Sequence, residues 1–115
     1  MSNQQVEAID RNIKAAKVSV DLGTALERLR GNADFKKVII DGYFSKEAVR
    51  LVHLKSAPDM QVPERQRSIL AQIDSIGALS AYLSLLIHEA AMAGKQIASD
   101  EEAREELLAE DLIND

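Results

Sequence analysis

One long stripe of apolar residues, between Pro63 and about Ala98, limits what this chain can fold into more than any other feature. Its members are Ile69, Ile73, Ile76, Leu83, Ile87, Ala90 and Ile97. They fall at alternating steps of four and three, with Ser80 and Gly94 in the two gaps. Such steps mark one face of an α-helix, and about 36 residues of helix make a rod of roughly 50 Å. A chain of 115 residues cannot enclose such a rod in a globule, so we predict a thin helical bundle.

The same segment carries a second stripe at steps of seven, formed by Leu79, Leu86 and Ala93. One heptad earlier this stripe holds Gln72, so its apolar part is confined to the middle and late turns. Two stripes make a face wider than one antiparallel partner helix covers. Either shorter helices of the same chain cover the second stripe, or another copy or another protein does. We expect a homo-oligomer, with the monomer as the alternative.

The composition indicates an all-α protein. The chain has five glycines and two prolines, too few for a domain of many short strands, which needs turn residues every ten or so positions. Aromatic residues make up 3% of the chain and tryptophan is absent, so the core is aliphatic, as helix packing prefers. Cysteine is absent, which excludes disulfides and thiolate metal ligands. We predict a single helical domain over residues 1–115.

Local signals place one long helix and two short helices before the stripe. The first is expected over about residues 3–30, ending at Gly31, because glycine is common just after helices. Gly23 lies inside this helix, where it is either tolerated or marks a kink, at about 1 kcal/mol relative to alanine. Asn32 and Ser45 are suited to cap the second and third helices.

The second half of the chain has equally clear signals for where helices begin and end. Residues 56–62 form the one clear loop, and Pro63 begins the long helix at a position where its missing N–H costs nothing. Ser99 and Glu102 fit a capping box, which predicts an acidic C-terminal helix to about Leu112. This last helix is either separate or the long helix bent at Ser99. We therefore predict a long antiparallel helical hairpin, two short helices between its arms, and a C-terminal acidic helix.

Charge is distributed unevenly along the chain. Residues 1–67 hold twelve Lys or Arg against nine Asp or Glu, a net charge of +3, whereas residues 68–115 hold two against ten, a net charge of −8. Residues 100–115 contain eight acidic residues and one basic residue, Arg104. Such an end repels nucleic acid, and it is either a solvated helix or a surface for a basic protein. We expect no nucleic-acid partner.

No catalytic, metal or cofactor motif occurs in the sequence. The two histidines, His53 and His88, lack the spacing of a zinc site, and the glycines form no phosphate-binding loop. The N-terminal residues lack the order of a signal peptide, and no uninterrupted run reaches the roughly 18 apolar residues of a membrane span. We expect a soluble cytoplasmic protein that is not an enzyme, binds no cofactor and has no membrane partner.

Three of the four aromatic residues lie between Asp34 and Phe44. This patch either caps one end of the bundle or anchors a partner protein, because aromatic side chains concentrate binding energy. The candidate partner-binding residues are Phe35, Tyr43, Phe44, Leu79 and Leu86.

The sequences of residues 34–44 (Asp-Phe-Lys-Lys through Asp-Gly-Tyr-Phe) and 47–52 resemble those of small helical proteins encoded by tailed bacteriophages. Residues 73–77 and the Glu-rich residues 101–106 are similar too, so the resemblance covers most of the chain. It implies a phage setting and assigns no residue a role. The expected function is a non-enzymatic assembly protein, a minor virion, scaffold or head–tail component that binds phage structural proteins or itself. The alternative is a small acidic phage protein that inhibits a host nucleic-acid-binding or defence protein.

Overall fold

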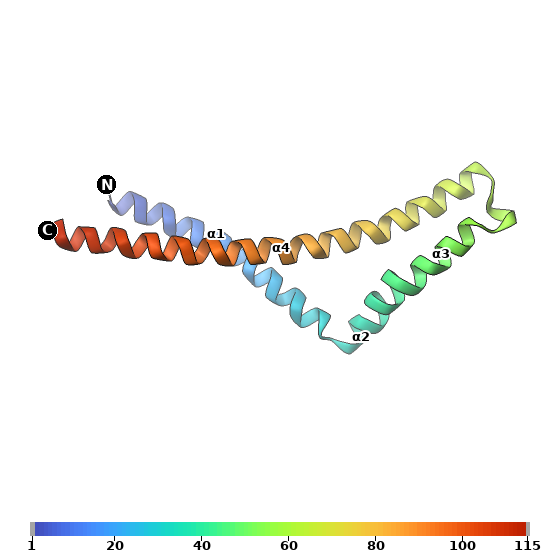
Figure 1. Cartoon of the computed structure of the whole chain (residues 1–115), viewed down its shortest axis with the longest axis horizontal. Coiled ribbons are helices and arrows are strands. Elements are labelled where there is room, and N and C mark those ends of the chain that lie inside the picture. Colours follow the sequence, from blue (N-terminus) through green and yellow to red (C-terminus); the bar gives the residue numbers. More distant parts are fainter. Residues whose placement is uncertain (1, 115) are drawn as a thin grey trace. The chain divides into compact units, whose positions relative to one another are not determined.

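The computed structural model describes residues 2–114, which are helical apart from short connections and contain no strand (Figure 1). The all-α prediction is confirmed. In chain order the elements are α1 (Ser2–Arg30), α2 (Ala33–Phe35), η1 (Lys36–Glu47), α3 (Ala48–Lys55), η2 (Pro58–Met60) and α4 (Pro63–Asn114).

The chain divides into two compact units. We call them the terminal unit, which is α1 up to Leu26 with α4 from Leu86 onward, and the central unit, Glu27–Leu85. Both α1 and α4 are continuous helices through the unit boundary.

In the terminal unit, α1 and α4 run antiparallel, as predicted. The first turns of α1 lie beside the last turns of α4 (Figure 1). Arg104 Nη1 donates a hydrogen bond of 2.7 Å to Asp10 Oδ1, and Gly23 lies against Ala90. Residue numbers therefore rise along α1 as they fall along α4. The buried apolar side chains of this unit are Ile13, Leu26 and Leu86.

Gly23 is buried where the two helices approach closely. A Cβ atom built on Gly23 would lie 2.3 Å from the Cβ of Ala90, far inside van der Waals contact. The helix is continuous through Gly23, so the glycine marks a close helix crossing.

The central unit packs η1 and α3 against the first turns of α4. Its buried core is Leu51, Ile69 and Ile76, and Leu51 is only 1% exposed. Half-buried apolar residues that pack on this core are Tyr43, Phe44, Ala48, Leu54, Met60 and Ile73. Helix α3 and the start of α4, which are close in sequence, thus share one aliphatic core.

Side-chain amides close the connection between α3 and α4. Gln61 Nε2 donates to the carbonyl oxygens of Lys55 and Ala57, both at 2.9 Å. Gln66 Nε2 donates to the carbonyls of Lys55 and Met60 at 2.9 and 2.7 Å. Lys55 is the last residue of α3, and its carbonyl is one of those that the end of a helix leaves without a partner in the helix.

Helix α4 begins at Pro63 as predicted, but it does not end near Ala98. The whole helix is 52 residues long and reaches Asn114, so of the two alternatives for the last segment, the separate helix that starts at Ser99 is wrong. The apolar spacing continues through Ile97 to Leu107, and packing of this half against α1 maintains the helix where the local capping signal alone indicated a new start. The predicted acidic C-terminal helix is the last part of α4.

The predicted stripe on α4 is only partly correct. The column Ile69, Ile76, Leu83, Ala90 and Ile97 is buried or half-buried as predicted. Ser80, Ile87 and Gly94 are exposed, and their places are taken by the second stripe: Leu79, Leu86 and Ala93. The reason is that Ile76 is followed by Leu79 after three residues rather than four, so the second buried column shifts by one position.

The end of α1 and the first cap agree with the sequence in outline. Asn32 Oδ1 accepts a hydrogen bond from the backbone N–H of Phe35 at 2.9 Å, as expected of a cap. Helix α1 ends before Gly31, yet no glycine described in the structure has a positive φ. Gly31 instead donates its N–H to the carbonyl of Glu27 at 3.1 Å, which continues the helical pattern by one residue.

The predicted break at Ser45 is wrong. Residues 36–47 form a π-helix that passes into α3 with helical geometry at both Glu47 and Ala48. A capping residue needs extended backbone, and the neighbouring Tyr43 and Phe44 pack on the core of the central unit. This packing supports helical backbone through Ser45. π-Helices are rare and are usually single turns, so a π-helix of 12 residues is unusual.

Candidate protein-interaction surfaces

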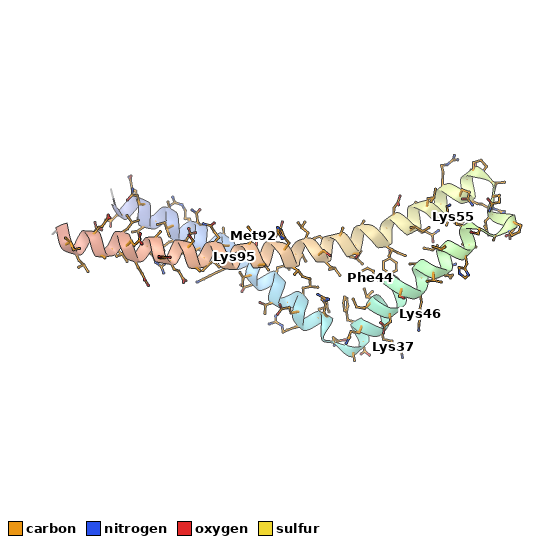
Figure 2. All side chains as sticks on the ribbon, in the orientation of Figure 1. Lys37, Phe44, Lys46, Lys55, Met92 and Lys95 are labelled. Atoms are coloured by element: carbon orange, nitrogen blue, oxygen red, sulfur yellow. The ribbon has the colours of Figure 1, made fainter. Side chains whose placement is uncertain are left out.

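The predicted aromatic patch is part of the central unit. Phe35 is half-buried, and Tyr43 and Phe44 pack on the buried core with ring centroids 5.9 Å apart. In Figure 2, Phe44 lies on the side of η1 that faces α4, whereas Lys37 and Lys46 lie on its outer side. The rings of Tyr43 and Phe44 thus contact the protein's own core.

Neither of the two leucines among the predicted partner-binding residues is exposed. Leu86 is buried in the terminal unit beside Gly23, and Leu79 is half-buried. The structure therefore does not bring the five predicted residues together into one exposed surface.

The exposed large apolar side chains are others, none of which the sequence analysis named as a partner-binding residue. Among the residues whose side chains are described, six apolar residues are buried and fifteen large ones are exposed. On α1 these are Val18, Leu22 and Leu29; on α4 they are Leu70, Tyr82, Leu85, Ile87, Met92, Leu108, Leu112 and Ile113. Val38, Val49, Val52 and Val62 complete the set. A chain with more large apolar side chains exposed than buried has abundant surface for protein contacts.

A shallow groove of about 470 Å³ lies on η1 and the start of α3. Its lining is mainly apolar: Val38, Ile39, Gly42 and Tyr43, with Lys46, Glu47 and Arg50 at its edge. Arg50 Nε donates to Glu47 Oε1, and this hydrogen bond holds the pKa of Glu47 below its ordinary value.

A second groove, of about 440 Å³, lies between α1 and α4 in the terminal unit. Its floor and rim are formed by Gln5, Ala8, Ile9, Ala103, Glu106, Leu107 and Glu110. This groove depends on which turn of α1 lies beside which turn of α4, and no local sequence signal gives that register.

Neither histidine belongs to a metal-binding cluster in the part of the chain that the structure describes. His53 and His88 are both exposed, and within residues 2–114 no three His, Asp or Glu side chains are grouped so that they could hold a metal ion.

Helix α4 contains an 18-residue window that is long and apolar enough to cross a membrane, and 17% of this window is buried. This is weak support for a membrane span, because the core helix of a soluble protein has the same length and composition.

Comparison with known proteins gives no family or relative: the chain matches no protein-family model, no curated protein and no solved structure.

Proposed function

We propose that this chain is a non-enzymatic assembly protein that uses exposed apolar faces of its helices to bind other proteins, including copies of itself. One observation carries the proposal: exposed large apolar side chains outnumber buried apolar ones, fifteen to six, among the described residues. Isolated apolar side chains are normal on protein surfaces, but so large an exposed share is typical of interaction sites.

The resemblance to small tailed-phage proteins adds a biological setting to this proposal, the assembly of a phage particle. In a phage, the protein would be a minor virion, scaffold or head–tail component, present in the host cytoplasm during assembly and carried in the virion if it stays bound. The contacts would be made by apolar helix faces, with the unequal charge of the two chain halves directing the encounter.

Sedimentation and binding together test the proposal. We expect the purified chain to self-associate with rising concentration, or to bind purified capsid, portal or tail proteins. A variant carrying Val18→Ser and Leu22→Ser should bind more weakly, because it removes exposed apolar contacts from α1. The matched control, Val49→Ser with Val52→Ser, changes two equally exposed valines of α3 and separates a specific α1 surface from general stickiness. A compact monomer at all concentrations that retains no structural protein would refute the proposal.

The acidic end of α4 favours a second candidate, an inhibitor of a basic protein. Glu101, Glu102, Glu105, Glu106 and Glu110 are all exposed on α4. An acidic helix of this kind could occupy a nucleic-acid site of a host enzyme.

Salt and charge neutralisation distinguish the two functions. Binding through the acidic residues should weaken steeply with ionic strength, whereas binding through apolar faces should not. Changing Glu101, Glu102 and Glu105, which lie outside the groove lining, to glutamine should weaken inhibition and leave apolar assembly intact. Deleting the segment is a poorer test, because Ala103 and Leu107 belong to the surface that meets α1.

A further inference from the structure

The groove of the terminal unit combines an apolar floor with an acidic rim. Ala8 and Ile9 of α1 and Ala103 and Leu107 of α4 are half-buried and form the floor. Glu106 and Glu110 are exposed and lie on the same side of α4, one helical turn apart. A ligand that fits this groove needs an apolar side chain for the floor and cations for the rim.

No basic side chain among the described residues pairs with the acidic rim. Arg104 is the one basic residue in residues 100–115, and its guanidinium is engaged by Asp10 at 2.7 Å. Among the described residues, neither Glu106 nor Glu110 forms an ion pair. The two carboxylates are therefore available for cations from outside the chain.

The chain itself carries a surface of the complementary chemistry. Arg11, Lys14 and Val18 recur on α1 at steps of three and four, so they lie on one face of the helix. All three are exposed, Val18 to 66%, and Leu22 extends the face with a further exposed apolar side chain. Neither Arg11 nor Lys14 forms an ion pair with a described residue. We call Arg11, Lys14, Val18 and Leu22 the basic stripe.

We infer that the groove of one copy binds the basic stripe of a second copy. Val18 would lie over the apolar floor, and Arg11 and Lys14 would face Glu106 and Glu110. Each copy has one groove and one basic stripe. In a two-fold symmetric pair, both grooves and both stripes are therefore occupied, and the assembly closes as a dimer. This inference rests on the proposed function and specifies one partner and one surface for it.

Charge reversal tests the inference by sedimentation of the full chain. The groove variant is Glu106→Lys with Glu110→Lys, and the stripe variant is Arg11→Glu with Lys14→Glu. Each variant alone should self-associate at least tenfold more weakly than the unaltered chain, because like charges then meet across both contacts. An equimolar mixture should regain association, because every groove again meets a stripe of opposite charge.

A matched control changes the same net charge on the same helix outside the groove: Glu101→Lys with Glu105→Lys. This variant should associate at least as strongly as the unaltered chain, and circular dichroism should show equal helix content in all variants. Failure of the mixture to associate overturns the inference, as does a chain that stays monomeric at every concentration. In the monomeric case the proposed function fails only if phage structural proteins also fail to bind.

Discussion

Replacing Gly23 with alanine is expected to destabilise the terminal unit even though alanine is the better helix former. On an isolated helix the change would be favourable by about 1 kcal/mol. In this structure the new methyl carbon would lie 2.3 Å from the Cβ of Ala90. Neither atom can rotate away, because each Cβ is fixed by its own backbone. The helices must therefore separate by roughly 1.5 Å to reach an ordinary carbon–carbon contact of about 3.5–4.0 Å.

Separation on this scale loosens the packing of the buried neighbours. Leu26 and Leu86, at 4% and 8% exposure, lie close by in sequence on the two helices. A gap of about 1 Å already forfeits up to half of a van der Waals contact, and overpacked cores lose about 1–3 kcal/mol. The steric term exceeds the propensity term, so we expect a net loss of about 1 kcal/mol and a melting temperature lower by roughly 4 °C.

Thermal and urea unfolding measured by circular dichroism would check this prediction against two companion variants. Gly94→Ala, also in the terminal unit, meets no atom within 4 Å and should stabilise the chain. Gly23→Ala combined with Ala90→Gly restores the space between the helices and should recover most of the loss. If Gly23→Ala stabilised the protein as Gly94→Ala does, the proposed close crossing of α1 and α4 would be refuted.

Three further predictions concern single side chains. Leu51→Ala should cost about 2–5 kcal/mol of unfolding free energy, since Leu51 is the most buried residue of the central core. Val52→Ala, at an exposed neighbour, should stay within about 0.5 kcal/mol in the same urea titration. Asp100→Leu should raise the melting temperature, because Oδ2 of Asp100 is buried without a hydrogen-bond partner among the described residues. An unchanged or lower melting temperature would contradict that assignment. Glu47 should titrate by NMR below its ordinary pKa of 4.5, and Arg50→Gln should remove the shift. Because the folded-state pKa is lowered, the pair's small stabilisation is present above the ordinary pKa and is lost as pH falls through the folded-state value.

Helix starts are predictable where the signal acts locally and nothing competes with it. Pro63 and Asn32 begin helices as predicted, because a missing N–H and a short side-chain acceptor act on the adjacent turn alone. Ser45 and Ser99 carry the same kind of signal and begin nothing. In both places, contacts with a distant segment favour a continuous helix, and a local signal contains no information about such contacts.

The buried face of α4 shows the same limit. Periodicity identifies the column from Ile69 to Ile97, because this apolar column is buried whichever helix packs against α4. It does not determine whether Ile87 or Leu86 completes the face, since that depends on the side from which α1 approaches. The groove at Ala103 and Leu107 is equally beyond local reasoning, because it exists only in the observed register of α1 and α4.

The continuity of α4 through both units has a consequence for the order of folding. Starting a helix is unfavourable, with a nucleation constant of about 10⁻³, whereas extending one adds a hydrogen bond for each residue fixed. The central unit closes over a short connection at Gln61, while the terminal unit joins Asp10 to Arg104 across 94 residues. Contacts between near neighbours in sequence form sooner. We therefore expect the central unit to nucleate α4, which then lengthens toward Asn114, so that α1 docks last, onto a helix that is already formed.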